Sequence, residues 1–294
     1  MSDALDQILT FVLVKKSKGD LDTLITALGL TLSASLSDDL AADFRLSRRL
    51  TKKDIESVLE AENIQADYCL QPSRNRKKKL LICDMDSTLI GQECIDELAD
   101  FAGFKEKVSA ITESAMRGEI GFDGALNDRV ALLEGLEISQ LQKCFDERIV
   151  VNSGAKTLCK TMKVNEAKTV IVSGGFTFFS ERVAKTIGFE HHHANVLLDD
   201  GIKLTGKVQR PILGREAKLD RLQEYSKAFG GPASAIAIGD GANDLAMIKA
   251  AGQGIAYYAK PAVAAAAHCA INYTDLRTAL YFQGYNDAEI IDED

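Results

Sequence analysis

The stretch LLICDMDST at Leu80–Thr88 decides the fold of this 294-residue chain. Its first four residues form an apolar run that is typical of a parallel strand covered on both faces. Similar short apolar runs stand at residues 169–172, 235–238 and 254–257, and helical segments separate them. Strands that alternate with helices predict an α/β domain built on a doubly wound parallel sheet with right-handed crossovers.

Two segments interrupt this alternation. Residues 92–145 form a helix-rich insertion with charges on one face, which we interpret as a helical cap inserted after the first strand. Residues 190–209 contain two short β-type stretches around Asp199-Asp200-Gly201, a sequence that predicts a hairpin. The acidic tail at residues 287–294 is expected to fray.

Residues 1–73 have the pattern of a small α+β domain. A strand at 8–14 precedes an amphipathic helix that Asp20 is placed to cap, and two strands follow within 31–46. A helix at 51–62 and a strand at 64–70 complete the pattern, which predicts helices on one face of an antiparallel sheet. We therefore expect one domain at 1–73 and a second at 74–294.

Residues 74–79 carry five basic side chains in six positions. Such a run is compatible with a nucleic-acid or targeting patch, or with a solvated linker that leads into a buried strand. We favour the linker because the chain as a whole is acidic, with a net charge of −8 and a pI of about 5.2. The same acidity argues against nucleic acid or an anionic membrane as a general partner.

The remaining composition points to a cytoplasmic protein that does not span a membrane. No apolar run approaches the roughly 18 residues that a membrane helix needs. The start of the chain, MSDALDQ, lacks the basic and apolar regions of a signal peptide. Six scattered cysteines without a C-x-x-C pair fit reduced thiols better than disulfides or a zinc site.

Polar residues follow three of the apolar runs at the point where each predicted strand ends. These are Asp84 and Asp86, then residues 173–175, then residues 239–244 with Asp240 and Asp244. Carboxyl ends of neighbouring parallel strands open into one crevice, where α/β sheets bind ligands. Four carboxylates held together there repel one another and call for protons or a hard cation such as Mg²⁺.

The same ends supply donors for an anion. Ser173 offers a hydroxyl and Gly174 a backbone N–H, while Lys218 offers a mobile ammonium. A crevice with both carboxylates and such donors is suited to a metal-assisted reaction at a phosphate group. Cys83, one residue before Asp84, is expected to be a small core residue.

The combined motifs resemble those of the haloacid dehalogenase superfamily. They are D-x-D-x-T at Asp84–Thr88, S-G-G at Ser173–Gly175, Lys218, and G-D-G-x-N-D at Gly239–Asp244. Longer matches, such as DMDSTLIGQECIDELA at 84–99, AMRG at 115–118 and SGGF at 173–176, resemble the phosphoserine phosphatase family. The resemblance spans residues 80 to about 285. Residues 1–73 are similar, more weakly, to ACT-like regulatory segments, which often pair and so imply a possible homodimer.

The resemblance implies a phosphatase that converts O-phosphoserine into serine and phosphate, the last step of serine biosynthesis. Asp84 would be the nucleophile that forms a phospho-aspartyl intermediate, and Asp86 the general acid and then base. Mg²⁺ would be held by Asp84, Asp240 and the backbone carbonyl of Asp86.

The resemblance also assigns residues to the phosphoryl group. In the family pattern the phosphoryl oxygens would be bound and stabilised by four residues: Ser173, Gly174, Lys218 and Asn243. Asp244 would orient Lys218 or a metal-bound water. Rival interpretations are a phosphatase or phosphotransferase for phosphohomoserine or phosphothreonine, differing in the cap, and a non-catalytic ligand sensor. The sensor would show degenerate motif residues, and no motif position here is degenerate.

Four residues of the insertion are substrate-binding candidates. Met116 and Phe122 are either core residues of the inserted helices or walls of the substrate pocket, where the resemblance places them. Glu93 and Arg129 are either an ordinary surface pair or, as we favour from the matched motifs, the partners of the substrate's ammonium and carboxylate groups. Residues 191–193, three adjacent histidines, cannot all face one metal ion and are expected in a surface loop.

Overall fold

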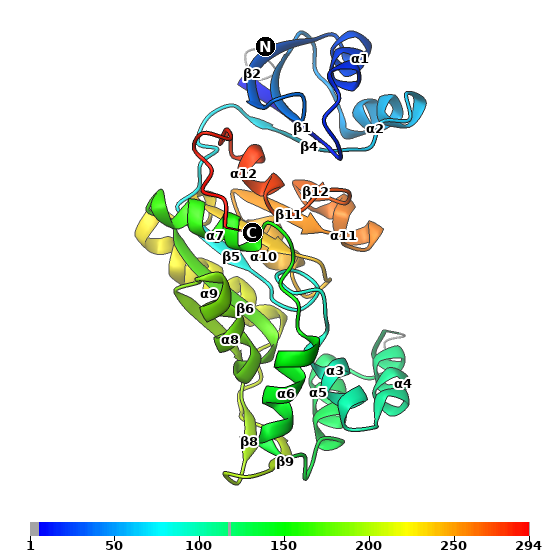
Figure 1. Ribbon diagram of the computed structural model, residues 1–294, viewed down its shortest axis with the longest axis vertical. Helices are drawn as coiled ribbons and strands as arrows, with labels where there is room; N and C mark the ends of the chain where they lie inside the picture. Colours follow the sequence, from blue (N-terminus) through cyan, green and yellow to red (C-terminus); the bar gives the residue numbers. More distant parts are fainter. Residues whose placement is uncertain (1–5, 117–118, 294) are drawn as a thin grey trace.

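Strands from both ends of the chain join in one sheet in the computed structural model (Figure 1). The structure describes residues 6–116 and 119–293, and it describes the side chains of all of these except residues 113–116. The twelve strands are β1 (Gln7–Leu13), β2 (Leu30–Ser37), β3 (Ala41–Leu46), β4 (Ala66–Pro72), β5 (Leu80–Cys83), β6 (Lys168–Phe176), β7 (His191–Asn195), β8 (Leu197–Asp199), β9 (Leu204–Val208), β10 (Ala235–Gly239), β11 (Gln253–Tyr257) and β12 (Cys269–Ile271). Ten of them form a single sheet in the order β2-β3-β1-β4-β12-β11-β10-β5-β6-β7.

Helices cover both faces of this sheet in the second half of the chain. The α-helices are α1 (Lys18–Leu28), α2 (Lys52–Ala61), α3 (Cys94–Phe101), α4 (Lys105–Met116), α5 (Phe122–Ala131), α6 (Ile138–Arg148), α7 (Ala155–Val164), α8 (Thr177–Ile187), α9 (Arg215–Ser226), α10 (Leu245–Ala250), α11 (Pro261–Ala266) and α12 (Thr278–Phe282). Side chains alternate along β5, so Leu81 and Cys83 pack with α7, α8 and α12, whereas Leu80 and Ile82 pack with α9 and α10. Burial on both faces explains why these strands are continuous apolar runs.

The strand order reverses between β5 and β10. From β5 the chain adds β6 and β7 on one side, then returns to add β10, β11 and β12 on the other, and all five pairings are parallel. Ligands of open α/β sheets bind outside the carboxyl ends of the strands at such a reversal. The predicted doubly wound parallel sheet is therefore confirmed, and its reversal lies between the strands that precede Asp84 and Asp240.

The N-terminal residues have the predicted order of strand, helix, two strands, helix and strand. Their strands pair antiparallel in the order β2-β3-β1-β4, and α1 and α2 bury one apolar cluster against them. The prediction that Asp20 caps α1 is wrong. The N-cap is Ser17, whose hydroxyl accepts the N–H of Asp20 at 3.2 Å.

The junction between β4 and the parallel strands is narrow. Tyr68 of β4 and Ala270 of β12 form one antiparallel bridge that makes the sheet continuous. The following basic run is only partly the solvated linker that the sequence predicts: four of its six residues are exposed, but the side chains of Arg76 and Lys78 are largely buried. Arg76 binds Asp43 with N–O distances of 2.5 and 2.9 Å, and Lys78 donates to the carbonyl of Ala233 at 3.1 Å.

The cap consists of α3–α6, close to the predicted bounds, and projects beside the hairpin β8–β9 (Figure 1). The hairpin is confirmed around the turn at residues 199–201. Backbone hydrogen bonds tie it to the loop between α5 and α6. Gly135 donates to Leu204 at 2.9 Å, Leu204 donates to Leu136 at 2.9 Å, and Ile138 donates to Ile202 at 2.9 Å.

Two further expectations fail. Residues 191–193 do not form a surface loop but the half-buried strand β7, where His193 Nε2 lies 2.8 Å from the Tyr225 hydroxyl. The acidic tail does not fray over its described residues: the N–H of Ile291 donates to Thr161 Oγ1 at 2.9 Å, and that of Glu293 donates to Thr157 Oγ1 at 3.0 Å.

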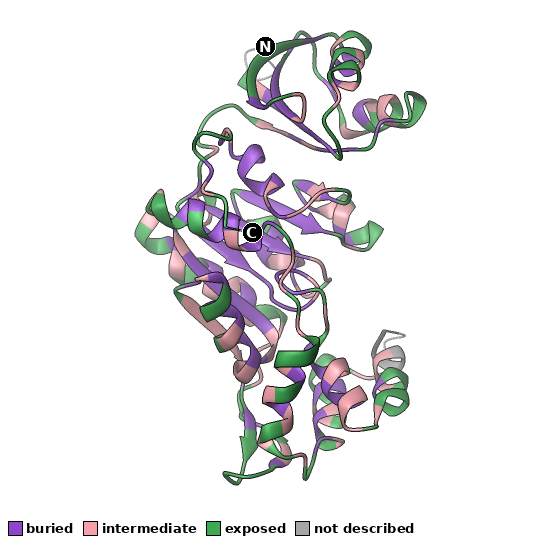
Figure 2. Ribbon diagram, viewed as in Figure 1, coloured by how far each residue is buried: buried purple, intermediate pink, exposed green. Residues whose placement is uncertain are grey.

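Figure 2 shows buried residues concentrated in the parallel strands, whereas the cap and the hairpin carry many exposed ones. All six cysteines are buried with free thiols. Among the helices of residues 6–116 and 119–293, none combines the length and apolar character needed to cross a membrane.

Candidate active site

Asp84 stands one residue beyond β5 and is only 5% exposed. Its backbone N–H still continues the sheet by donating to Ile238 of β10 at 2.9 Å. The chain then turns sharply, since the amides of Thr88 and Leu89 both donate to the carbonyl of Met85. This turn places the Asp84 carboxylate at the mouth of the reversal between β5 and β10.

Asp240 and Asp244 follow β10 in the same region. Asp240 Oδ1 accepts the Thr88 hydroxyl at 2.9 Å, which links the two strand ends. Asp244 Oδ2 accepts the N–H of Gly241 at 3.0 Å and so holds the loop before α10. A side chain at Gly239 would place its Cβ only 2.4 Å from Asp244 Cγ, so this close approach requires glycine.

Lys218 reaches this cluster from α9 and is 1% exposed. Its ammonium lies 2.6 Å from Asp84 Oδ2 and 2.6 Å from Asp244 Oδ1. Burial opposes the charged form, but the two carboxylates outweigh it and raise the pKa of Lys218. Lys218 is therefore a fixed positive charge beneath the nucleophile candidate.

One ammonium does not balance the nearby carboxylates. Oxygens of Asp84, Asp240 and Asp244 all lie within 4.8 Å of one another. Burial and the neighbouring Asp244 raise the pKa of Asp84 well above its usual value, and the same causes raise the pKa of Asp240 to about 6. A compact set of carboxylates with excess negative charge fits a hard divalent cation such as Mg²⁺.

Asp86 faces the same cavity from the other side of the turn. Its Oδ1 accepts the N–H of Cys94 at 2.9 Å, and its Oδ2 accepts the hydroxyl of Ser173 at 3.2 Å. Burial raises the pKa of Asp86. The Ser173 hydroxyl also accepts the N–H of Gly175 at 2.9 Å, and a Cβ at Gly175 would lie 2.5 Å from Asp86 Oδ2. The S-G-G sequence thus lets β6 approach the Asp86 carboxyl closely.

These groups surround a cavity of about 140 Å³ between the strand ends and the cap. Phe122, at the start of α5, forms part of the cap side. A Cβ built on Gly174 or on Gly214 would lie 3.4 or 3.5 Å from the Phe122 ring, which is ordinary van der Waals contact, so the ring packs over both glycines. The full lining comprises Asp84, Asp86, Glu93, Ile95, Phe122, Leu126, Arg129, Gly174, Gly175, Phe176, Asp240 and Asn243.

The cap contributes one acidic and one basic group to the cavity. Glu93 Oε1 accepts the Ser87 hydroxyl at 2.7 Å, and burial together with nearby Asp86 raises the pKa of Glu93 to about 7. Arg129 donates through Nε to the carbonyl of Ala125 at 3.2 Å, which leaves the outer nitrogens of its guanidinium for other partners. Its pKa is lowered by burial.

The structure brings the predicted residues together around one cavity. Ser173, Lys218 and Asp244 lie directly behind its lining, and the remaining predicted residues line it, except that the side chain of Met116 lies outside the described residues. Phe122 is not a core residue of the cap, since it is 41% exposed and faces the cavity. Cys83 is buried in β5, and burial raises its pKa well above the usual value, which fits its predicted place in the core.

Sequence reasoning missed three kinds of contact. The Ser87 hydroxyl donates to the Glu93 carboxylate six residues later, and neither helix nor strand periodicity brings residues at this spacing together. Ile95 and Leu126 line the cavity although their pattern indicates ordinary helix core. Asn195 holds the Gly174 carbonyl with a hydrogen bond of 2.9 Å, and no sequence signal distinguished it.

The family model of haloacid dehalogenase-like hydrolases matches residues 81–249, and this chain belongs to that family. Within it, the similarity is to phosphoserine phosphatases. A probable phosphoserine phosphatase of Schizosaccharomyces pombe is 42% identical over 235 residues, which make up 79% of this chain and 78% of that protein.

Two solved structures extend the comparison. The unliganded probable phosphoserine phosphatase from Vibrio cholerae has a TM-score of 0.81 at 28% identity, covering 97% of this chain and 88% of its own. A phospho-aspartyl intermediate analogue of a phosphoserine phosphatase has a TM-score of 0.65 at 39% identity, covering 70% of this chain and 99% of its own. The first similarity includes the N-terminal strands, and the second is restricted to about two-thirds of the chain.

Proposed function

We propose that this chain hydrolyses O-phosphoserine to serine and inorganic phosphate, the last step of serine biosynthesis. The observation that carries the proposal is that a buried aspartate pair and an acid–guanidinium pair line the same small cavity. The first pair, Asp84 and Asp86, suits the phosphate end of the substrate. The second pair, Glu93 and Arg129, suits its ammonium and carboxylate end.

The aspartate pair divides the reaction into two displacements at phosphorus. A carboxylate oxygen of Asp84 forms a bond to phosphorus while the bond to the serine oxygen breaks, and Asp86 gives its proton to that leaving oxygen. Asp86 then takes a proton from water, whose oxygen attacks phosphorus and releases Asp84 and phosphate. The raised pKa of Asp86 favours the protonated form that the first displacement needs.

Donors behind the cavity suit the phosphoryl oxygens. Lys218 lies 2.6 Å from the Asp84 carboxylate, close enough for its ammonium to reach a phosphate bound there. Ser173 and the backbone of Gly174 stand beside Asp86, and Asn243 lines the cavity. Fixed donors of this kind stabilise the charge that develops on the transferring group. We assign Asp244 to holding Lys218, which it contacts at 2.6 Å.

The carboxylate set supports Mg²⁺ as the cofactor. We propose that Asp84, Asp240 and the backbone carbonyl of Asp86 hold the ion. When bound, Mg²⁺ supplies positive charge that reduces repulsion between the phosphate and the carboxylates around it.

The cap supplies recognition of the amino-acid part. Glu93 would accept hydrogen bonds from the substrate ammonium, and Arg129 would grip the carboxylate with two parallel N–H donors. Phe122 covers Gly174 and closes the side of the cavity against water. Met116, at the end of α4, is assigned to the same wall from the family resemblance alone.

We further propose that residues 1–73 form an ACT-like domain, that residues 74–294 form the catalytic domain, and that the protein acts in the cytoplasm. The free buried thiols support the cytoplasm. The edge strand β2, whose residues 31–35 are exposed, supports a homodimer, because an edge strand offers unpaired backbone groups to a second copy.

A substrate comparison tests the proposed function. Arg129→Ala should lower kcat/KM for phosphoserine by roughly 30- to several thousandfold, the equivalent of about 2–5 kcal/mol for a buried charged contact. The rate with p-nitrophenyl phosphate, which has no carboxylate, should barely change. Glu93→Gln should show the same selectivity.

Arg148→Ala is the matched control. Arg148 lies on cap helix α6, pairs with Asp100 at 3.3 Å, and does not line the cavity. Its loss should leave both substrates unaffected. Equal losses of both activities in Arg129→Ala, or another phosphomonoester hydrolysed faster than phosphoserine, would contradict the proposed function.

A further inference from the structure

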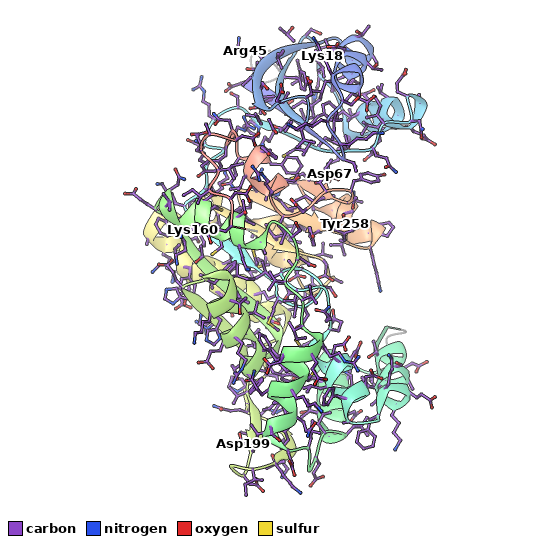
Figure 3. The ribbon with its side chains drawn as sticks, in the orientation of Figure 1. Lys18, Arg45, Asp67, Lys160, Asp199 and Tyr258 are labelled. Carbon is purple, nitrogen blue, oxygen red and sulfur yellow. The ribbon has the colours of Figure 1, made fainter. Side chains whose placement is uncertain are left out.

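A buried carboxylate of the N-terminal strands is bound entirely by a loop of the C-terminal part. Asp67, in β4, is 2% exposed and lies where these two parts meet (Figure 3). Its Oδ1 accepts the N–H of Asn272 at 2.7 Å. Its Oδ2 accepts the N–H of Tyr273 at 3.3 Å and both the N–H and the hydroxyl of Thr274, at 2.9 and 2.6 Å. Asp67 therefore fixes the first residues after β12.

The same loop continues to the segment that returns from the cap. Asp275 Oδ2 accepts the hydroxyl of Ser153 at 3.0 Å, and the N–H of Leu276 donates to the Ser153 carbonyl at 3.2 Å. Next to it, a Cβ on Gly154 would lie only 2.3 Å from the backbone nitrogen of Arg277. The loop is thus packed directly against the chain at Ser153–Gly154.

From there the contacts reach the active site in two more steps. Asn152 donates through its backbone to Leu89 at 2.9 Å and through its side chain to the Thr88 carbonyl at 2.8 Å. Thr88 in turn donates its hydroxyl to Asp240 at 2.9 Å. The connections that enter and leave the cap, residues 84–93 and 149–154, meet at this point through the bridge between Ile90 and Val151.

We propose that Asp67 is a positioning residue for the phosphatase site, acting through the loop at 272–277 on the turn that carries Asp84 and Thr88. The kcat measurements that test this role rest on the proposed function. Every link between Asp67 and Asp240 is a direct hydrogen bond or a step of one or two residues along the chain. In the described structure residues 85–88 pair with no neighbouring strand, so contacts such as those from Asn152 contribute to the position of the turn.

A purely structural role for Asp67 makes a different prediction. If it only holds the N-terminal strands in place, any contact across the same junction should serve equally well. Lys52 provides that comparison, because its ammonium crosses the junction from α2 and donates to the carbonyl of Ala267 at 2.8 Å, outside the loop at 272–277.

The test compares Asp67→Asn with Lys52→Met in the full chain. The asparagine amide presents an NH₂ group to backbone N–H donors, so part of the loop contact is lost. Asp67→Asn should lower kcat by roughly two- to thirtyfold, the range found for residues that couple distant sites. The loss should be the same for phosphoserine and p-nitrophenyl phosphate with little change in KM, because the nucleophile turn serves both. Lys52→Met should keep the wild-type kcat.

A second variant keeps the test decisive if Asp67→Asn folds poorly. Asp275→Asn weakens the contact with Ser153 at a less buried position and should reproduce the loss of kcat. The double variant should lose no more than the larger single loss, since both changes break one series of contacts.

Hydrogen–deuterium exchange gives a readout that needs no substrate. In Asp67→Asn, amides of residues 84–92 and 149–154 should exchange faster, while those of β7 and α9 stay unchanged. Wild-type kcat in folded Asp67→Asn or Asp275→Asn, or equal losses in Asp67→Asn and Lys52→Met, would overturn the proposal. A wild-type protein inactive on phosphoserine would count against the proposed function alone, because the exchange pattern is independent of it.

Discussion

Replacing Lys218 with methionine should destabilise the metal-free protein strongly. The change keeps the length of the side chain but removes the only ammonium between Asp84 and Asp244 that the described residues provide. At 2.6 Å and an effective dielectric constant of about 20, each contact is worth roughly 6 kcal/mol before desolvation. Burial of the three groups offsets much of this gain, and loss of one partner from a buried pair costs about 3–5 kcal/mol.

The cost should depend on pH. Without Lys218, the buried Asp84 carboxyl loses a positive charge that lowers its pKa, so its folded pKa, already raised by burial and by nearby Asp244, rises further above the unfolded value of about 3.9. The folded variant then holds a proton that the unfolded chain has released, and its stability falls as pH rises. The deficit relative to wild type should therefore be larger at pH 8 than at pH 5.

Thermal unfolding in EDTA measures both effects. At about 2–4 °C per kcal/mol, Tm should drop by roughly 6–20 °C at pH 8. Lys78→Met is the matched control, because Lys78 is also buried but, among the described residues, donates to two carbonyl oxygens, at 2.8 and 3.1 Å, and to no carboxylate. Its deficit should be similar at both pH values. A Tm for Lys218→Met within about 2 °C of wild type, or a larger deficit at pH 5, would refute this account of Lys218.

Three other changes test the remaining proposals. Asp84→Asn should abolish phosphate release from phosphoserine in a protein that still folds, because an amide is no nucleophile; turnover near the wild-type rate would rule out Asp84 as the attacking group. Activity should vanish with EDTA and return with Mg²⁺. Ca²⁺ should inhibit, because its coordination shell is larger and more flexible. Full activity in excess chelator would contradict the metal proposal. A protein that begins at Arg74 retains every motif residue and should keep measurable turnover. Its Tm should be lower, because residues of α12 lose their packing against β1 and β4. A folded but wholly inactive product would mean that the N-terminal residues are needed at the site itself.

The sequence predicted the elements whose own residues show a clear apolar pattern. Strands β5, β6, β10 and β11 are buried on both faces, so their apolar runs were unambiguous. Motif residues at their ends could be placed because carboxyl ends of parallel strands share one edge of a sheet. The cavity lining of Asp84, Asp86 and Asp240 follows from that rule alone.

Contacts between residues far apart in sequence were beyond such reasoning. Arg76 is buried because Asp43, 33 residues earlier, neutralises it. Strand β7 carries three histidines that hydrophobic patterns do not recognise, and β12 has only three residues. The choice between Ser17 and Asp20 as helix cap depended on backbone geometry, since both residue types favour that position.

The hydrogen bonds between the hairpin β8–β9 and the α5–α6 loop affect how such enzymes can be recombined. The cap helices are encoded as one stretch. Strand β9, whose Leu204 forms backbone hydrogen bonds with Gly135 and Leu136, is encoded some 60 residues later. A chimaera that exchanged only residues 94–148 between relatives would set Gly135 and Ile138 against a foreign hairpin. The portable unit is therefore discontinuous, and both stretches of the gene must be transferred together to preserve the contacts between the cap and the hairpin.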